Sequence, residues 1–362
     1  EQGHWSASPA TVIRRLARNF GISRGVDLAV ECDLPESSGM STSSAVICYM
    51  WLVLAERNQI CEMPRFKQEL MSDEDLYSYL GFIENGQDCG KVLVGDKGVG
   101  TFGGSEDHTA IMACKEGHLE MFSYCPTKHE ASFKFPDDLV FVIAVSGALA
   151  EKTGNAMADY NNAAFLARDA AAAWVDANAA LPLGGATFVP GRANLAEIVR
   201  HVRSTTPGDD AAVRKAIGDA IATRDGHGGK AGYRPGALRG RFEQFFDESE
   251  MLVEGIAKSL AAKEFEALGR YSDESHRQTV EVLCNTIPAT AWLPQKARVL
   301  GALGASAFGA GFGGSCWAVV EEPAASDFME RWRSAYHEEF PRWAESSRFF
   351  SMRPGPGAFA LW

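Results

Sequence analysis

The chain has few basic residues for its size. Lys and Arg together number 35, against 47 Asp and Glu, and the formal net charge is −12 at pH 7. Binding to nucleic acid requires a basic face that displaces counterions from the phosphate backbone. The charge balance therefore argues against a nucleic-acid partner, and it argues equally against docking on an anionic membrane.

Long apolar runs are also missing. No run reaches the ~20 residues that a membrane-spanning helix needs. Residues 1–30 lack the basic and then apolar plan of a signal peptide. We therefore expect a cytoplasmic protein without a membrane partner.

The eight cysteines include no CxxC pair. Most of them lie inside apolar segments, so we expect reduced and mostly buried thiols in a cytosolic protein. The histidines at positions 201, 227 and 337 have no partner at ligand spacing, and we expect no metal site built from His or Cys.

The 362 residues, 46% of them hydrophobic, suffice for two domains. In residues 26–34, VDLAVECDL, apolar and acidic residues alternate, which predicts a strand with one wet face. The run LVFVIAV at 139–145 predicts a strand buried on both faces. Helices are expected at 11–20, 45–56, 73–86, 155–178 and 238–260, and loops at 184–191 and 225–236. Strands and helices without a strict βαβ rhythm predict an α+β fold.

Hydroxyl side chains crowd the start of an expected helix between Pro35 and Ala45. Unpaired backbone N–H groups at a helix start bind anions, and hydroxyls beside them can reach phosphate oxygens or Mg²⁺. Serines that simply cap a buried helix are the alternative. Four hydroxyls in a row exceed what one cap requires, so we favour a phosphate loop made of Gly39, Ser41, Thr42, Ser43 and Ser44.

A second glycine-rich stretch, GTFGGSEDH at 100–108, ends in two adjacent carboxylates, Glu106 and Asp107. Neighbouring side chains diverge on a helix or a strand, and the pattern does not separate these two structures here. One carboxylate could accept the proton of an attacking hydroxyl. The alternative is an aspartate that caps the next helix, with His108 at its surface.

A third stretch, GAGFGG at 309–314, leads into an expected strand, SCWAVV. Dense glycine permits close backbone approach to a ligand, although a tight loop at a sheet corner is the more frequent cause. The dinucleotide-binding GxGxxG should follow a strand and open a helix, so this stretch is not that motif.

In this order the three stretches resemble the sugar-kinase branch of the family named for galactokinase, homoserine kinase, mevalonate kinase and phosphomevalonate kinase. Residues 35–45, PESSGMSTSSA, look like its second motif, PxxxGLSSSAA, and 309–314 are similar to its third motif, GxGFGG. Residues 103–107, GGSED, fall where galactokinases carry GIMDQ. The resemblance implies two lobes, 1–136 like ribosomal S5 domain 2 and 137–362 with a ferredoxin-like core.

The resemblance also implies roles for single residues. Asp107 matches the catalytic aspartate that prepares the sugar C1 hydroxyl, and Ser43 matches the serine near Mg²⁺. Glu84 is the candidate Mg²⁺ carboxylate, although the family places it closer to the aspartate, so an inserted loop is required. Tyr160, beside Asn161, and Gly104 would contact the sugar, and the nucleotide would bind at the phosphate loop and at Gly311, Gly313 and Gly314.

The family's first motif, similar to PGRVNLIGEHTDY, is absent from this sequence. Because the second motif begins at Pro35 and the chain opens without methionine, we expect that about a hundred upstream residues are missing. The resemblance implies ATP and Mg²⁺ as cofactors and galactose or a related aldose as substrate. A non-catalytic sensor that binds ATP and sugar, and a kinase for a non-sugar alcohol, are the rival interpretations. The oligomeric state is left open.

Overall fold

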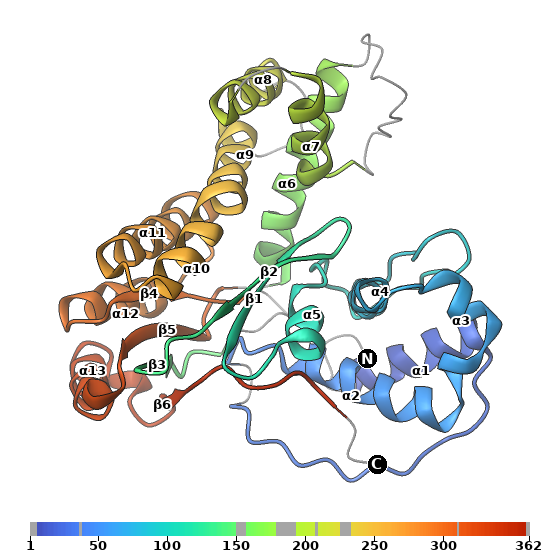
Figure 1. Ribbon diagram of the computed structural model, residues 1–362, viewed down its shortest axis with the longest axis horizontal. Helices are drawn as coiled ribbons and strands as arrows, with labels where there is room; N and C mark the ends of the chain where they lie inside the picture. Colours follow the sequence, from blue (N-terminus) through green and yellow to red (C-terminus); the bar gives the residue numbers. More distant parts are fainter. Residues whose placement is uncertain are drawn as a thin grey trace.

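The structure is a computed structural model that describes residues 6–35, 38–149, 157–178, 193–206, 209–224, 233–309 and 311–359. It has two lobes of mixed helix and sheet, which confirms the expected α+β architecture (Figure 1). The expected boundary at 136/137 falls in the connection between strands β2 (Lys128–Lys134) and β3 (Leu139–Val145). The boundary itself stays a prediction. No helix within the described ranges is long and apolar enough to cross a bilayer.

The first lobe packs helices around one apolar cluster. Helix α1 contributes Val12 and Leu16, and α2 contributes Trp51, all fully buried or nearly so. An antiparallel hairpin follows, with an irregular register between Met121 and Phe122. The elements are α1 (Ala7–Phe20), α2 (Thr42–Arg57), α3 (Pro64–Glu69), α4 (Asp73–Asn85), α5 (Glu106–Ala113), β1 (His118–Ser123) and β2 (Lys128–Lys134).

The second lobe is built on a four-stranded antiparallel sheet in the order β4-β5-β3-β6. Chain order and strand order together give the βαββαβ arrangement of a ferredoxin-like core, as expected from the resemblance. Helices α12 and α13 pack their apolar faces on this sheet. The elements are β3 (Leu139–Val145), α12 (Pro288–Val299), β4 (Gly304–Ala307), β5 (Ser315–Glu321), α13 (Ala325–Glu339) and β6 (Arg348–Met352).

Between β3 and β4 the chain forms a tall helical layer that rises from the sheet (Figure 1). Its far end has a separate apolar cluster, in which Phe242 is fully buried. The expected helix at 238–260 is present, widened in the middle by one π-helical segment, η3 (Glu248–Leu252). The elements are α6 (Met157–Ala177), α7 (Leu195–Thr205), α8 (Asp210–Ala222), α9 (Ala237–Asp247), α10 (Val253–Ala261), α11 (Phe265–Gln278) and the π-helical η4 (Thr279–Leu283). The loop expected at 184–191 lies outside the described residues, as do residues 225–232 of the loop expected at 225–236.

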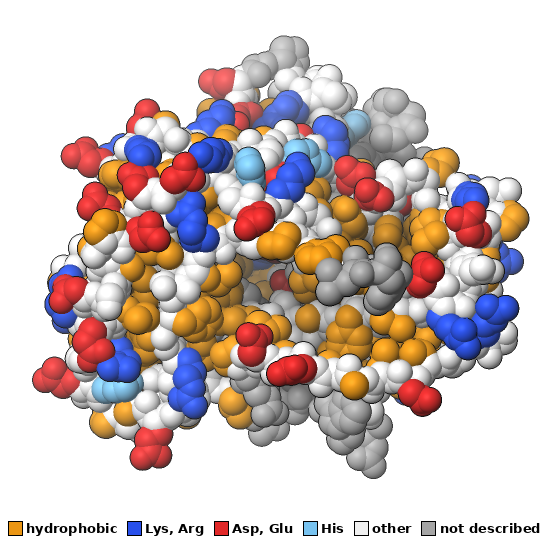
Figure 2. All heavy atoms as spheres, turned by 60° about the horizontal axis from the view of Figure 1, so that its bottom comes forward, with side chains coloured by type: hydrophobic (Ala, Val, Ile, Leu, Met, Phe, Trp, Pro, Cys, Tyr) orange, Lys and Arg blue, Asp and Glu red, His pale blue; other side chains and the backbone are white. Residues whose placement is uncertain are grey.

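The strand expected at 26–34 is wrong. This segment is extended but unpaired, and Val30 keeps 57% of its surface exposed. A strand needs a neighbour for its N–H and C=O groups, and no described strand runs beside this segment. The segment runs along the lower edge of the molecule in Figure 1. Figure 2 turns this edge toward the viewer and shows many exposed hydrophobic side chains on that face.

The expectation of mostly buried cysteines is also wrong. Only Cys48 and Cys316 are buried, whereas four thiols are exposed, namely those of Cys32, Cys61, Cys125 and Cys284. An apolar neighbourhood in the sequence does not bury a residue when its segment lies at the surface. All eight cysteines are free.

Candidate active site

Helix α2 begins without a side-chain cap. Ser41, at its N-cap, adopts the left-handed conformation with φ 53°, and its hydroxyl makes no capping hydrogen bond. Simple capping by the serine cluster is therefore not what the structure shows. The first N–H groups of α2 carry the positive end of the helix dipole, which suits an anion.

Two hydroxyls of the cluster bind one buried carboxylate. Ser43 Oγ donates to Glu84 Oε1 at 2.8 Å, and Ser44 Oγ donates to Glu84 Oε2 at 2.9 Å. His108 Nε2 lies 3.1 Å from Glu84 Oε2. His108 is 1% exposed, so it is not the surface histidine that the alternative interpretation required. The structure thus brings together Ser43 and Glu84, the two residues expected to hold Mg²⁺.

The loop between Glu84 and Asp107 is closed at its base. Val99 N donates to the carbonyl of Glu84 at 2.8 Å, and a Cβ at Gly98 would collide with that same carbonyl. Arg14 of α1 holds the loop through an ion pair with Asp96 at 2.7 Å. Glu84 and Asp107 are far apart in the sequence, but the loop between them returns the chain to Glu84 at Val99, as the expected inserted loop requires.

Close helix packing brings the two carboxylates of α5 to the same region. A Cβ at Gly81 of α4 would lie 2.8 Å from Ser105 Cα, so glycine allows the start of α5 to approach α4. Burial, together with the charges of Glu84 and Asp107, raises the pKa of Cys48 to about 12. The charges of Glu84 and Asp107 therefore both affect the Cys48 thiol, which indicates that the two carboxylates lie in the same region.

Glu106, in the same turn as Asp107, has a different environment. Its side chain keeps contact with solvent. Partial desolvation, and then the charges of Asp107 and Glu248, raise the pKa of the Glu106 carboxyl. Glu248 belongs to η3, so Glu106 lies where the two lobes face each other.

The glycine turn at 309–314 packs directly on the phosphate loop. A Cβ at Gly309 would lie 2.5 Å from the carbonyl oxygen of Gly39, and one at Gly314 would lie 2.8 Å from that of Ser38. Ser315 Oγ donates to Ser38 O at 2.7 Å. Two stretches far apart in sequence and in different lobes thus form one surface.

Other glycines of this turn serve backbone packing. Gly311 and Gly313 both have positive φ, and a Cβ on either would collide with backbone, the carbonyl of Asn285 for Gly311 and that of Ala148 for Gly313. Phe312 N also donates to Asn285 O, at 2.5 Å. The tight-loop interpretation therefore accounts for these two glycines, and their contact with a nucleotide stays a prediction.

Helix α6 holds the glycine-rich loop that precedes α5. Asn161 Oδ1 accepts from Phe102 N at 3.2 Å, and Asn161 Nδ2 lies 3.5 Å from Gly100 O. The side chain of neighbouring Tyr160 lies outside the described residues. A Cβ at Gly104 would meet nothing within 4 Å, so space is open in front of this expected sugar contact.

Sequence reasoning missed three residues that shape the site. Asn85 Nδ2 donates to Gly103 O at 2.9 Å, His108 faces Glu84, and Asn285 supports the glycine turn. Position beside an expected site residue could have pointed to Asn85 and His108. Nothing local pointed to Asn285, because its contact joins segments that only the fold brings together.

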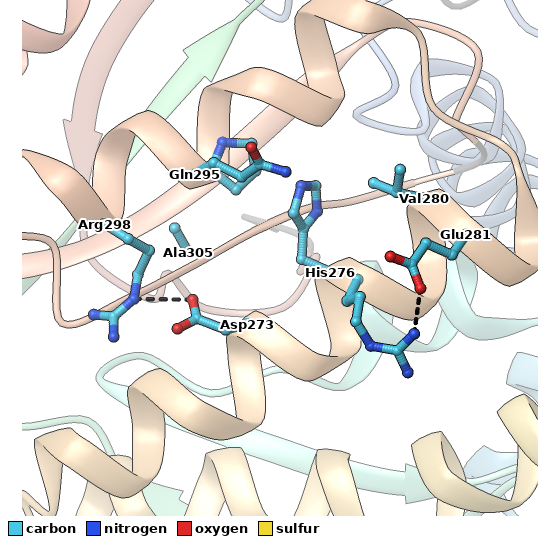
Figure 3. Close-up of a pocket in the computed structure, with 9 residues that line it drawn as sticks. Asp273, His276, Val280, Glu281, Gln295, Arg298 and Ala305 are labelled. Atoms are coloured by element: carbon cyan, nitrogen blue, oxygen red, sulfur yellow. Dashed lines mark hydrogen bonds and ion pairs between the residues drawn. The ribbon is translucent and has the colours of Figure 1, made fainter.

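A cavity of about 290 Å³ lies elsewhere, between α11, η4, α12 and β4 (Figure 3). None of the expected site residues lines it. Its two arginines are already paired, Arg298 with Asp273 at 2.9 Å and Arg277 with Glu281. The imidazole of His276 also lines the cavity.

His276 predicts a pH-dependent stability. Its Nε2 lies 3.0 Å from the carbonyl of Ala291, which can only accept, so Nε2 carries the proton. Burial lowers the pKa of His276. The unfolded chain then binds the extra proton first, so stability is full above the usual histidine pKa of about 6.5 and falls as the pH drops below it. We expect His276→Gln to reduce this fall, measured as the free energy of unfolding at several pH values, and the same fall in the variant would contradict this role of His276.

Gly309 offers a test of the contact between the two loops. Gly309→Ala places a methyl group against the Gly39 carbonyl and should push the turn off the phosphate loop, raising the KM for ATP about tenfold. Gly301→Ala is the matched control, since Gly301 has a positive φ of 104° but open space around it. Equal effects of both substitutions would show that backbone strain alone, and not the contact, is responsible.

Among the described residues no group of three or more His, Cys, Asp or Glu side chains could hold a metal ion. A carboxylate beside hydroxyls instead suits a cation bound mainly by phosphate oxygens. The oxygen ligands of Ser43 and Glu84 are of the hard type that Mg²⁺ prefers, and they fit such a site.

Comparison with known proteins gives a consistent result. Residues 8–95 match the GHMP kinases N terminal domain, and residues 256–338 match the GHMP kinases C terminal domain. A galactokinase of Thermococcus kodakarensis is 34% identical over 103 residues, which cover 28% of this chain and 29% of that protein. The aligned stretch thus spans less than a third of the relative's length.

A similar solved structure is that of Lactococcus lactis galactokinase complexed with galactose. It superposes with a TM-score of 0.66 at 18% sequence identity, covering 100% of this chain and 78% of that chain. At this identity the likeness supports the fold.

Proposed function

We propose that the chain is an ATP-dependent sugar kinase, because its residues 8–95 and 256–338 match the N-terminal and C-terminal domains of GHMP kinases. The observation that carries this proposal is the meeting of three elements at one place. The uncapped start of α2, the Ser43–Glu84 pair and the α5 carboxylates come together beside a glycine turn from the other lobe.

In the proposed reaction the N–H groups at the start of α2 bind the ATP phosphates, and Asp107 accepts the proton of the attacking sugar hydroxyl. The hydroxyl oxygen bonds to the γ-phosphorus as the bond to the β,γ-bridging oxygen breaks, and ADP leaves. No covalent enzyme intermediate is required. Ser43 and Glu84 would hold Mg²⁺, which neutralises phosphate charge when bound.

Galactose phosphorylated at C1 is the first acceptor that we propose, and related aldoses follow. Gly104, with open space before it, and Tyr160 would contact the sugar. The proposed lobes are 1–136 and 137–362, with ATP and sugar meeting between them. We also propose a cytoplasmic location, because exposed free thiols such as Cys61 and Cys284 persist in a reducing compartment.

The decisive experiment measures ADP release by the purified chain with Mg·ATP and a panel of aldoses. Release that depends on one sugar would establish the kinase and name its acceptor. Equilibrium binding of ATP and sugar without ADP release would instead identify a sensor. Release with mevalonate or homoserine, and not with any aldose, would move the chain to another branch of the family.

A further inference from the structure

The segment after β6, residues 353–358, connects the sheet of the second lobe with helix α5 of the first. We call it the post-β6 segment. Figure 1 shows the chain leaving β6 and passing below α5. Both of its ends are held by hydrogen bonds to other parts of the chain.

The sheet end is held by Arg353. Its guanidinium donates to the carbonyls of Leu139 at 2.5 Å, Asp137 at 3.0 Å and Pro136 at 3.2 Å. It also lies over the ring of Phe135, 5.2 Å from the centroid. Three carbonyl acceptors on one planar cation fix both the position and the direction of the segment.

The other end binds the end of α5. Ala358 N donates to Ile111 O, and Gly357 N donates to Cys114 O, both at 2.6 Å. The last four carbonyls of any helix lack an intrahelical partner. The post-β6 segment supplies donors at this helix end from a remote part of the chain.

Helix α5 is short and depends on its contacts with other elements. It spans 8 residues, and Ser105 at its N-cap makes no side-chain capping bond. Helices shorter than about 12 residues are marginal without tertiary contacts. The position of α5 is therefore set by α2, by α4 and by the segment at its C-terminal end.

We propose that the post-β6 segment is a positioning element for the phosphoryl transfer proposed above: by holding the C-terminal end of α5, it sets where Asp107, at the other end, stands relative to the phosphate loop. The inference rests on the proposed function. A helix of two turns moves as a rigid unit, so displacement at one end moves the carboxylate at the other. A misplacement of about 1 Å can cost about 10²-fold in rate.

Gly357 is the residue that tests this role. A Cβ there would lie 2.6 Å from Met112 O and 3.0 Å from Cys114 O, so any side chain forces the segment away from α5. Gly355, two residues earlier, has nothing within 4 Å of such a Cβ. Substitution at Gly355 therefore changes the same segment without disturbing the contact.

The experiment compares Gly357→Val with Gly355→Val, and Gly357→Ala replaces the first variant if it fails to fold. We expect kcat to fall about 10²-fold in the Gly357 variant, with the KM for ATP unchanged. Hydrogen exchange in residues 106–113 should become faster in that variant alone. A merely structural role would lower the melting temperature without this separation of kcat from KM.

The other outcomes contradict either the positioning role or the proposed function. A Gly357 variant with wild-type kcat, or with unchanged exchange in α5, contradicts the positioning role while leaving the kinase in place. Absence of ADP release by the wild-type chain with every acceptor overturns the proposed function, and the positioning role with it.

Discussion

Asp107→Asn is expected to lower kcat by about 10² to 10⁴-fold, the usual contribution of a general base. Asparagine keeps the shape of the side chain but cannot accept the proton of the sugar hydroxyl at neutral pH. Asp107 lies in the first turn of α5, whereas the phosphate loop lies at the start of α2, where Ser43 and Ser44 bind Glu84. The substitution should therefore leave the phosphate loop in place. The KM for ATP should therefore stay near its wild-type value.

The matched control is Glu106→Gln, which removes a neighbouring carboxylate from the same helical turn. We expect a much smaller effect on kcat, since adjacent side chains diverge on a helix. Both variants are measured by ADP release at saturating ATP and sugar. Full turnover by Asp107→Asn, or a larger loss in Glu106→Gln, would assign the proton acceptor to another group.

Glu84→Gln is expected to raise the Mg²⁺ concentration needed for half-maximal activity about 10 to 100-fold. The carboxylate accepts from Ser43 and Ser44 through its two oxygens and faces His108. An amide has one acceptor oxygen and no charge. It therefore cannot accept from the two hydroxyls through separate oxygens, and it does not attract a cation as a carboxylate does. The measurement is ADP release against Mg²⁺ at fixed ATP.

The two serines provide the control. Ser43 is partly exposed and is the proposed Mg²⁺ contact, whereas Ser44 is fully buried. Ser43→Ala should shift the Mg²⁺ dependence. Ser44→Ala should leave it unchanged and destabilise the fold by about 1 kcal/mol through the lost hydrogen bond. An unchanged Mg²⁺ midpoint in Glu84→Gln would remove Glu84 from the proposed metal site.

The separation of Glu84 from Asp107 along the chain is a feature that the sequence could not interpret correctly. The pattern places this carboxylate on a helix before a glycine-rich loop, which is correct. Its distance from Asp107 along the chain argues against a shared site. The hydrogen bond from Val99 N to Glu84 O reverses this argument, because it closes the intervening loop. A contact of this kind joins positions that no local pattern relates.

The segment at 26–34 shows the opposite failure. Its alternation satisfies the period of a strand, but pairing depends on a neighbouring strand, and within the described residues none is present. The expectation of buried cysteines is wrong for a similar reason, since burial is a property of the packed molecule. Neither outcome is determined by the order of residues within a short window.

The sequence by itself determined the elements that depend on local interactions. These include the helix after the serine cluster, the buried strand LVFVIAV at 139–145 and the positive φ angles at Gly309, Gly311, Gly313 and Gly314, where glycine removes the Cβ clash. Tertiary structure alone decided that Ser43 faces Glu84, that the glycine turn covers the phosphate loop, and that residues 357 and 358 bind the end of α5. The reason is physical: backbone conformation follows from neighbouring residues, whereas a site assembled from both lobes requires the packing of the whole chain.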